Sequence, residues 1–164
     1  MQDVKDEIVA LIPRLRRFTW ALTGSRDEGD DLVQSGCLKA LASIGQFQPG
    51  TRLDSWMFRI MRTVWMDKRR SVARRPTVND ADAIENMSDS GSAVRGLEAR
   101  LTLRRVRAAM AELPAEQREV LAMVAIEGHS YREVADTLGV PIGTVMSRLA
   151  RARAKLADRI EEVA

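Results

Sequence analysis

The fold is decided by residues 130–153, which have the sequence SYREVADTLGVPIGTVMSRLARAR. Ser130 is followed three residues later by Glu133, and this spacing predicts a capping box at the start of a helix. Gly139 suits the left-handed position after that helix, and Pro141 suits the first turn of a second one. The connection between the two helices is only about three residues long. The stretch therefore predicts a helix-turn-helix.

The second helix of this motif has two distinct faces. Val145, Leu149, Ala152 and Leu156 recur at helical spacing and are expected to pack inward. The opposite side carries hydroxyl and cationic groups suited to base edges and phosphates in a major groove. Its members are Thr144, Ser147, Arg148, Arg151 and Lys155. A solvated helix that is basic only for solubility is the alternative, but it does not explain why cap, turn and inward stripe occur in register.

The composition of the 164-residue chain fits small helical bundles. Hydrophobic residues make up 45% of the sequence and aromatic residues 4%, and no alternating strand pattern occurs. The net charge of +3 permits a polyanionic partner without requiring one. The distribution of charge along the chain is more informative. Residues 1–75 carry fourteen Lys/Arg and nine Asp/Glu, whereas residues 76–96 carry one Lys/Arg and four Asp/Glu. The basic excess therefore belongs to the N-terminal part.

Periodicity divides the chain into two helical blocks. Apolar stripes predict an N-terminal domain over residues 1–75, with three helices or with four if Pro13 breaks the first. Residues 76–96 lack periodicity and accumulate Asp, Asn, Ser and Gly, which predicts a flexible acidic linker. Residues 97–164 predict a four-helix domain that ends in the helix-turn-helix. The expected fold class is all-α, with two small helical domains.

The third predicted helix, from about residue 52 to 72, has a basic face that its core role does not use. It ends in the cations Lys68, Arg69 and Arg70. An outward Trp65 beside them would offer a flat surface to an unstacked base, as in sites that hold single-stranded nucleic acid. A half-buried core position is the equal alternative for Trp65. Trp56 is expected in the core, because it shares a face with apolar residues.

The helix before it carries a cluster of polar side chains. Acidic residues in its first turns are favourable at the positive end of the helix dipole, which is a sufficient structural reason for some of them. Asp30, Asp31, Gln34 and Lys39 also lie together as a polar face suited to a protein partner. The dipole alone does not require so many acids, so this face is a candidate interface.

The single cysteine and the single histidine give little sign of chemistry. Cys37 excludes a disulfide within the chain and is expected to be a buried thiol rather than a redox sensor. His129 lacks the cysteines or second histidine of a metal site and is expected to be a turn residue. We expect no cofactor and no metal. Without a secretory signal or an apolar run of about 18 residues, the protein is expected to be cytoplasmic.

Three stretches resemble parts of bacterial extracytoplasmic-function (ECF) sigma factors of the sigma-70 family. DDLVQ at 30–34 with LKAL at 38–41 is similar to the core-polymerase-binding part of sigma region two. FQPGTRLDSWMF at 47–58 with DKRR at 67–70 is similar to its promoter-melting and minus-ten-reading part. LP at 113–114, EQREV at 116–120 and the helix-turn-helix resemble sigma region four, the minus-35 reader. The resemblance covers nearly the whole chain outside the linker.

The resemblance implies a protein without catalysis of its own, which binds RNA polymerase core, directs it to a promoter and helps to open the duplex. Asp30, Asp31, Gln34 and Lys39 would meet the polymerase, whose clamp helices and flap are the implied contacts. Minus-ten DNA would be held by Phe47, Arg52, Asp54, Arg62, Thr63, Trp65, Lys68, Arg69 and Arg70. Minus-35 DNA would be read by Thr144, Ser147, Arg148, Arg151 and Lys155. The linker would thread the polymerase active-site channel. An anti-sigma factor is a further implied partner, and the free protein is expected to be a monomer.

The chain departs from the family pattern at three places. Thr63 stands where an Asn is common in the region-two pocket, and Met146 stands where a Lys is frequent. Ser35-Gly36-Cys37 replaces the usual acidic and bulky residues, and a glycine inside a helix costs about 1 kcal/mol relative to alanine. These positions bear on minus-ten preference, on one phosphate contact and on the polymerase-binding face.

Other functional classes explain less of the chain. A plain helix-turn-helix regulator needs neither the basic third helix nor the acidic linker. A sigma mimic that sequesters an anti-sigma factor would keep the fold and lose the DNA contacts, whereas Arg148 and Arg151 are present. An enzyme is least expected, because the chain has no paired acid and base, metal set or glycine loop for phosphate.

Overall fold

The computed structural model of the chain describes residues 2–73, which we term the first half, and residues 95–163, the second half. The first half contains α1 (Gln2–Thr23), α2 (Arg26–Ala42), the 3-10 turn η1 (Ile44–Gln46) and α3 (Leu53–Ala73). The second half contains α4 (Arg95–Ala111), α5 (Ala115–Leu121), the π-helical turn η2 (Ala122–Ile126), α6 (Tyr131–Leu138) and α7 (Ile142–Val163). The described residues include no strand, so the all-α prediction is confirmed.

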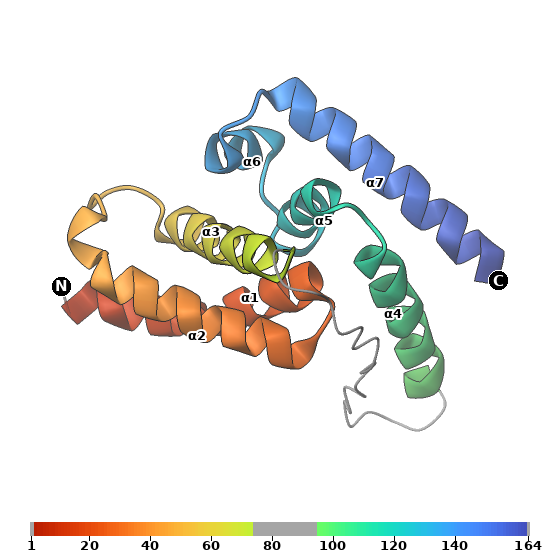
Figure 1. Cartoon of the computed structure of the whole chain (residues 1–164), viewed down its shortest axis with the longest axis horizontal. Coiled ribbons are helices and arrows are strands. Elements are labelled where there is room, and N and C mark those ends of the chain that lie inside the picture. The colour runs from red at the N-terminus through yellow and green to blue at the C-terminus, as the bar shows by residue number, and fades with distance from the viewer. Residues whose placement is uncertain (1, 74–94, 164) are drawn as a thin grey trace.

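The helices of the two halves pack against each other. In Figure 1, α1 and α2 form an antiparallel pair with α3 against them, and α7 extends across the far side of α4 and α5. Helix α5 and the turn η2 contact α1, while α6 contacts α3. The N- and C-termini lie at opposite ends of the molecule (Figure 1). The chain in this state is therefore a closed arrangement rather than two separate bundles.

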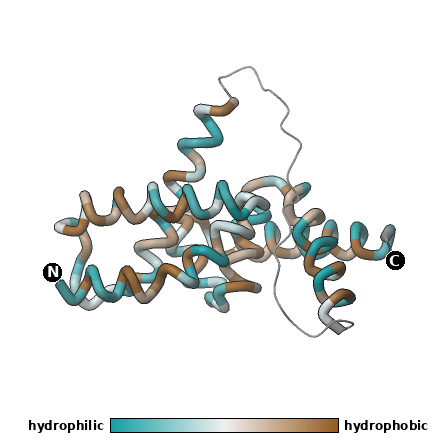
Figure 2. The backbone as a smooth tube through the Cα atoms, turned by 90° about the horizontal axis from the view of Figure 1, so that it is seen from below, coloured by the Kyte–Doolittle hydropathy of each residue, from teal (hydrophilic) through white to brown (hydrophobic). Residues whose placement is uncertain are grey.

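A single hydrophobic core runs through both halves. Phe18 of α1 and Phe58 of α3 meet edge to face with their ring centroids 4.7 Å apart, and both are buried together with Leu15 and Val120. Burying one side chain of this size stabilises the fold by about 1.5–3 kcal/mol. Figure 2 shows the hydrophobic residues recurring along each helix. The predicted inward stripes are thus the core.

Helix α1 runs without a break through Pro13. The sequence left open whether this proline splits the helix, and the structure decides for one helix. Pro13 is exposed, and the buried Ile8 and Leu15 lie on either side of it. Packing of these flanking residues outweighs the hydrogen bond that proline cannot donate. The first half consequently has three α-helices among its described residues.

The expected linker falls mostly on residues that lie outside those described. Helix α4 begins at Arg95, so the last two residues of the predicted linker, 95 and 96, belong to a helix instead. Residues 76–94 lie outside the described ranges. The division into domains at 1–75 and 97–164 remains a proposal.

Two glycines of α2 allow it to approach its neighbours closely. A Cβ at Gly36 would collide with the thioether of Met61, which is fully buried. A Cβ at Gly29 would collide with the Trp20 ring and would lie 3.0 Å from the Trp20 backbone nitrogen. The glycine within the Ser35-Gly36-Cys37 departure from the family pattern thus has a packing reason. Close contact between α2 and α3 offsets the lower helix propensity of Gly36.

We expect Gly29→Ala to lower the free energy of unfolding by about 1–3 kcal/mol, because the backbone of α1 must move away from the new methyl group. Urea unfolding followed by circular dichroism measures this change. Gly143→Ala is the matched control, since nothing lies within 4 Å of a Cβ at that helical position. Its stability should be unchanged or higher. Equal stability of Gly29→Ala and the parent protein would contradict the packing argument.

Candidate nucleic-acid and polymerase interface

The helix-turn-helix forms as the sequence predicts. The Ser130 hydroxyl accepts a hydrogen bond from the Glu133 backbone N–H at 3.1 Å, and the Glu133 carboxylate accepts one from the Ser130 N–H at 2.8 Å. Gly139 ends α6 in the left-handed conformation with φ of +67°. That conformation is strained for a residue with a side chain, so glycine sets the angle at which α7 leaves the turn.

The inward stripe of α7 is confirmed, but its outward face needs a correction. Ser147 and Arg151 are exposed to solvent, and Thr144 is half-buried. The Arg148 side chain is only 19% exposed, and its guanidinium lies 3.6 Å from the Glu116 carboxylate of α5. Lys155 donates to the backbone carbonyl of Glu112 at 3.4 Å. Two of the five expected groove residues therefore have partners in their own half, Arg148 on α5 and Lys155 on the turn after α4.

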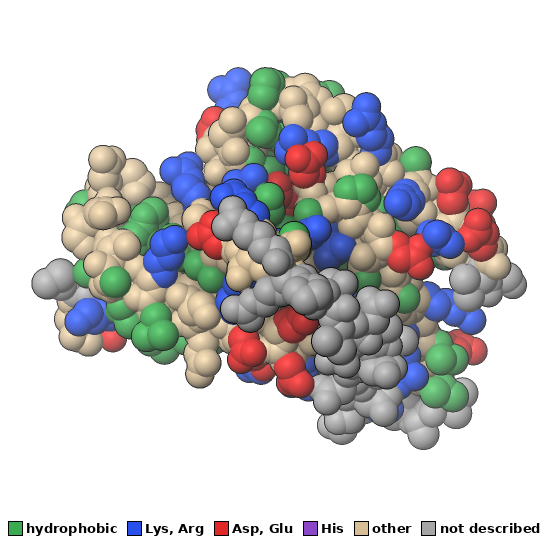
Figure 3. Space-filling model, viewed as in Figure 1, with side chains coloured by type: hydrophobic (Ala, Val, Ile, Leu, Met, Phe, Trp, Pro, Cys, Tyr) green, Lys and Arg blue, Asp and Glu red, His purple; other side chains and the backbone are tan. Residues whose placement is uncertain are grey.

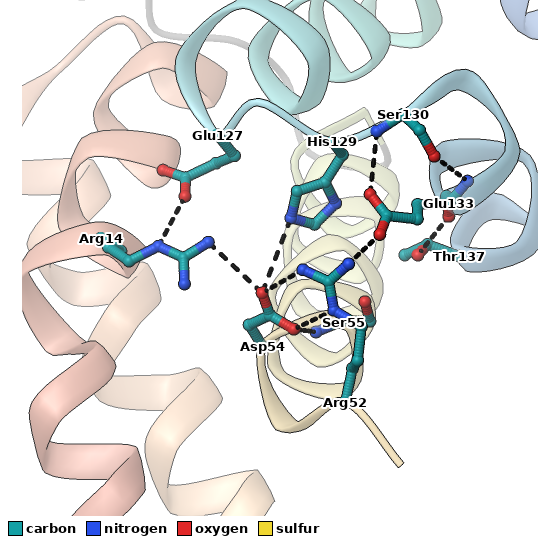
Figure 4. Close-up of polar contacts among 9 residues, drawn as sticks. All are labelled: Arg14, Arg52, Asp54, Ser55, Glu127, His129, Ser130, Glu133 and Thr137. Carbon is teal, nitrogen blue, oxygen red and sulfur yellow. Dashed lines mark hydrogen bonds and ion pairs between the residues drawn. The ribbon is translucent and has the colours of Figure 1, made fainter.

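Asp54, at the start of α3, stands at the centre of a polar network between the halves. Its carboxylate accepts hydrogen bonds from the Arg52 guanidinium at 2.8 and 3.1 Å and from the Ser55 backbone N–H at 2.8 Å. Arg14 of α1 donates to it at 3.3 Å, and the His129 Nε2 of the second half lies 3.9 Å away. Figure 4 shows these side chains converging on Asp54 from both halves.

The charges in this network shift one another's ionisation. Burial acts to raise the pKa of Asp54, but hydrogen bonds from Arg52 and the Ser55 backbone outweigh it, so the pKa is lowered. Burial lowers the pKa of His129 below its ordinary value, so it favours the neutral form of the ring. A neutral His129 beside an ionised Asp54 is consistent with the edge contact of its ring with Phe58, at 5.2 Å between centroids.

Three arginines of the first half bind glutamates of the second. Arg14 Nε donates to Glu127 Oε2 at 3.0 Å and Arg62 Nε donates to Glu119 Oε2 at 2.8 Å. Arg52 pairs with Glu133, so that this glutamate serves both the helix cap and the contact between halves. Burial raises the pKa of Glu119, although Arg62 opposes the shift. The minus-ten candidates Arg52 and Asp54 thus contact each other, and Arg52, Asp54 and Arg62 all face residues of the second half.

The expectation of an outward Trp65 is corrected, because its ring lies in the core. Trp65 is 6% exposed, with Arg69 stacked over the ring at 5.0 Å and Arg118 at 5.9 Å. The alternative considered from the sequence, a core position, is the one the structure shows. Trp56 is half-buried and packs against Phe47, with centroids 5.3 Å apart.

The remaining minus-ten candidates lie along α3. Thr63 uses its hydroxyl proton within the helix, because Oγ1 donates to the backbone carbonyl of Arg59 at 2.9 Å. Lys68, Arg69 and Arg70 are exposed at the C-terminal end of α3. They remain accessible to a phosphate backbone in this arrangement.

A hollow of about 460 Å³ lies where α3 ends beside the start of α2. Its lining includes Asp31 from α2 and Trp65, Lys68 and Arg69 from α3. The structure thus brings one polymerase-binding candidate next to three minus-ten candidates. The sequence had placed these residues on separate surfaces.

The polar face of α2 is only partly free. Asp30 accepts hydrogen bonds from Arg16 at 3.0 Å and from the Trp20 indole N–H at 2.9 Å, and the Arg16 bond lowers its pKa. Asp31, Gln34 and Lys39 are exposed. Asp30 therefore fastens α2 to α1, and its three neighbours form the accessible part of the candidate interface.

Sequence reasoning missed the residues that join the halves. Arg118 and Glu119 were noted only as part of the EQREV stretch of the resemblance and Glu127 not at all, and His129 was assigned to a turn without a partner. Arg118 is buried and donates to the backbone carbonyls of Leu22 at 2.6 Å and Leu113 at 2.9 Å. The one hint in the sequence was that the charged residues 118 and 119 directly precede the apolar run at 120–126, and charged residues are buried only when they are paired.

Charged side chains of both signs share the face of the molecule that Figure 3 shows. In Figure 3, basic and acidic side chains are interleaved across the face that Figure 1 presents. Within residues 2–73 and 95–163, no group of three or more His, Cys, Asp or Glu is placed to hold a metal ion. None of the described helices is long and apolar enough to cross a membrane. Cys37 is half-buried, and burial raises the pKa of its thiol.

Comparison with known proteins covers both halves. The family model described as Sigma-70, region 4 matches residues 103–156, and the one described as Sigma2 domain of PhyR matches residues 8–62. The ECF RNA polymerase sigma factor EcfG of Rhodopseudomonas palustris is 41% identical over 154 residues, which cover 94% of this chain and 83% of the relative. The chain belongs to the extracytoplasmic-function family of RNA polymerase sigma factors. The resemblance seen in the sequence is therefore confirmed.

Further matches of this sigma factor agree with that assignment. The probable RNA polymerase sigma-C factor of Mycobacterium bovis is 37% identical over 130 residues, which cover 79% of this chain and 69% of the relative. The sigma factor RpoE from Bartonella quintana, solved in complex with the anti-sigma factor NepR, matches with a TM-score of 0.79 at 31% identity over 98% of both chains. The similarity thus includes the placement of both halves.

We expect His129→Gln to flatten the dependence of stability on pH between about pH 7.5 and 5.5. The pKa of His129 is lowered by burial from its ordinary 6.5, so below that pH the unfolded chain takes up a proton that the folded sigma factor resists. The parent protein should lose up to about 1.4 kcal/mol of stability per pH unit from this one group as the pH falls.

Urea unfolding at three pH values checks this expectation. Burial shifts the pKa of Glu119 upward, which gives stability the opposite pH dependence, so the quantity to compare is the difference between the two proteins. Identical slopes for His129→Gln and the parent sigma factor would show that His129 is not the titrating group.

Proposed function

We propose that this chain is an alternative sigma factor that binds RNA polymerase core and directs it to promoters, with the second half reading minus-35 DNA and the first half reading minus-ten DNA. The observation that carries the proposal is the helix-turn-helix with Ser147 and Arg151 exposed on α7, in a chain whose relatives are ECF sigma factors. The chain itself would do no catalysis, and the polymerase would supply the chemistry. It would act in the cytoplasm, where that polymerase is found.

On the minus-35 element, α7 would lie in the major groove. A side chain with a planar guanidinium, such as Arg151, suits the O6 and N7 atoms of guanine, and Ser147 and Thr144 suit base edges or phosphates. Arg148 and Lys155 would join them once their contacts with Glu116 and Glu112 yield to phosphate. For Lys155, exchange of the Glu112 carbonyl for a phosphate oxygen is favourable, because a hydrogen bond between two charged groups is stronger than one to a neutral carbonyl.

On the minus-ten element, the start of α3 and its basic end would hold unpaired DNA. Phe47, Arg52, Asp54, Arg62 and Thr63 would surround a base taken out of the stack, and Lys68, Arg69 and Arg70 would hold the backbone. Trp65 would support this surface from the core, because its ring is the platform on which Arg69 lies. Asp31, Gln34 and Lys39, with Asp30 behind them, would meet the polymerase.

Control by an anti-sigma factor is part of the proposal. The matched sigma factor RpoE was solved with the anti-sigma factor NepR, and the matched CnrH was solved with the cytosolic domain of CnrY. The match to RpoE includes the placement of both halves at 31% identity. The free chain would be a monomer that such a partner holds away from polymerase.

A sigma mimic is the second candidate, because the first half matches the family model named for PhyR. The PhyR protein of Bartonella quintana is an anti-anti-sigma factor that was solved with NepR, and its 16% identity to this chain shows a shared fold alone. Run-off transcription on a genomic fragment library with purified, sigma-free polymerase core separates the two. A sigma factor gives discrete start sites, whereas a mimic gives none.

We expect Arg151→Ala to reduce the affinity for minus-35 duplexes recovered from that library by about 5- to 150-fold, because a guanidinium contact to guanine is worth about 1–3 kcal/mol. Fluorescence anisotropy with labelled duplex measures the loss. Arg153→Ala is the control, because Arg153 has the same charge and exposure but lies about 160° around the helix. Equal losses for the two variants would mean that only net charge matters.

We expect Asp31→Lys to weaken association with polymerase core severalfold while leaving minus-35 binding intact. Asp31 is exposed, so the change removes a candidate contact without breaking the Arg16–Asp30 pair that fastens α2. Competition against a labelled reference sigma factor for core measures the affinity. Asp158→Lys, an exposed acid on α7, is the control for charge. Normal core binding by Asp31→Lys would remove α2 from the proposed interface.

A further inference from the structure

The side chains exposed at the start of α7 are mostly apolar. Ile142 and Met146 are 47% and 52% exposed. Of the exposed residues between 142 and 150, only Ser147 has a polar side chain, and its hydroxyl donates to the backbone carbonyl of Thr144 at 3.1 Å. This end of the helix therefore offers a partner few hydrogen-bonding groups and two large apolar ones.

Ile142, Met146 and Ala150 form a row along the exposed surface of α7, which we call the apolar row. They follow one another at intervals of four residues, and side chains with this spacing are neighbours on a helix. Ser147 and Arg151 each come one position after a member of the row, so they lie about 100° further around the helix. The apolar row thus lies beside the exposed polar side chains that the proposed function assigns to minus-35 DNA.

The apolar row is not needed for the core of the second half. Val145 and Leu149 are the buried residues of this part of α7, with exposed fractions of 0% and 2%. Within residues 2–73 and 95–163, neither Ile142 nor Met146 belongs to the hydrophobic core or packs against it. Single exposed apolar residues are common on protein surfaces, but here two of them follow each other on successive turns of a recognition helix. The row is therefore available to a partner of that helix.

The position of the apolar row determines which part of a duplex it meets. In a helix-turn-helix, the N-terminal residues of the second helix contact the base edges in the major groove, and Ile142 is the first residue of α7. The C5-methyl group of thymine is the apolar group that base pairs present in that groove. At Gly143, beside the row, an added Cβ would have no neighbour within 4 Å, so the approach to the row is open.

We propose that Ile142 and Met146 read thymine in the minus-35 element by contact of their side chains with its C5-methyl group. This inference rests on the proposed function, from which it takes the placement of α7 in the major groove. Ser147 and Arg151 contact polar base edges or phosphates in this arrangement. Contacts to phosphate carry no sequence information, whereas contact with a methyl group distinguishes thymine from the other three bases. The apolar row is thus a determinant of promoter specificity.

Replacement of thymine by uracil tests the proposal, because uracil lacks only the C5-methyl group and pairs with adenine in the same way. The probes are minus-35 duplexes of a promoter recovered by run-off transcription, with each thymine replaced in turn by deoxyuridine. The protein should bind at least one of these duplexes about fourfold more weakly, which is the factor for one methylene-sized group left in water. Fluorescence anisotropy measures the affinities. Equal affinity for thymine and uracil at every position would overturn the proposal.

The double variant Ile142→Ala/Met146→Ala assigns the methyl contact to the apolar row. It should bind the thymine duplex severalfold more weakly and should no longer distinguish it from the uracil duplex. Because both side chains are exposed, the circular dichroism spectrum should be unchanged. Ile160→Ala is the matched control, since Ile160 is 41% exposed near the other end of α7, and it should keep the full preference for thymine. A preference that survives in the double variant would overturn the proposal.

Met146→Lys tests whether this position faces the duplex. An ammonium group beside the phosphates should make log affinity fall more steeply with log salt concentration, by about one unit of slope. Ile160→Lys, with the same added charge at the far end of the helix, should change the slope less. An unchanged slope for Met146→Lys would mean that the apolar row lies away from the duplex, as it would if the row bound a protein, and would overturn the proposal.

This proposal and the proposed function fail in different ways. If the chain gives discrete start sites with polymerase core but binds thymine and uracil duplexes equally, the sigma function stands and the apolar row does not read thymine. If the chain starts no RNA from any fragment, no minus-35 duplex is recovered. In that case the sigma function itself is wrong, and the inference falls with it.

Discussion

The pairing of buried carboxylates with arginines is the constraint on which the closed structure depends. An isolated buried charge is too costly to persist, so Glu119 and Glu127 require Arg62 and Arg14 as partners. Because each partner lies in the other half, the requirement fixes how the halves meet. Asp54 completes the arrangement by holding Arg14 and Arg52 together at the junction. The pairing of glutamates with arginines, together with apolar contact, therefore sets how the two halves are placed relative to each other.

The same pairing links the fold to the function. A surface that attracts phosphate is also a surface that attracts carboxylates, and in a chain with both, each competes for the arginines. The second half supplies its carboxylates at very high effective concentration because the chain connects the two halves. Ser147 and Arg151 escape this competition because α7 turns them away from the first half. The pairing thus engages Arg52 and Arg62 of the first half and leaves Ser147 and Arg151 of the second half exposed.

The site residues could be predicted from the sequence to different extents. The capping box of Ser130 and Glu133 and the left-handed Gly139 were predictable, because each depends on neighbours within a few residues. The burial of Trp65 was not predictable, because the periodicity of α3 leaves it at the edge of the apolar stripe. In the structure Arg69 and Arg118, from α3 and from the second half, lie over its ring. Gly36 looked like a weak point of α2 until the position of Met61 was known.

By itself, the sequence determined the helices, their caps, the inward stripe of α7 and the family, because these follow from local spacing and from motifs that lie along the chain. Only the tertiary structure decided which charges meet. Arg62 and Glu119 are 57 positions apart and Arg14 and Glu127 are 113 apart, and no local pattern encodes a pairing at that separation. The physical reason is that a helix specifies its own faces, whereas a salt bridge between helices depends on how those faces are packed.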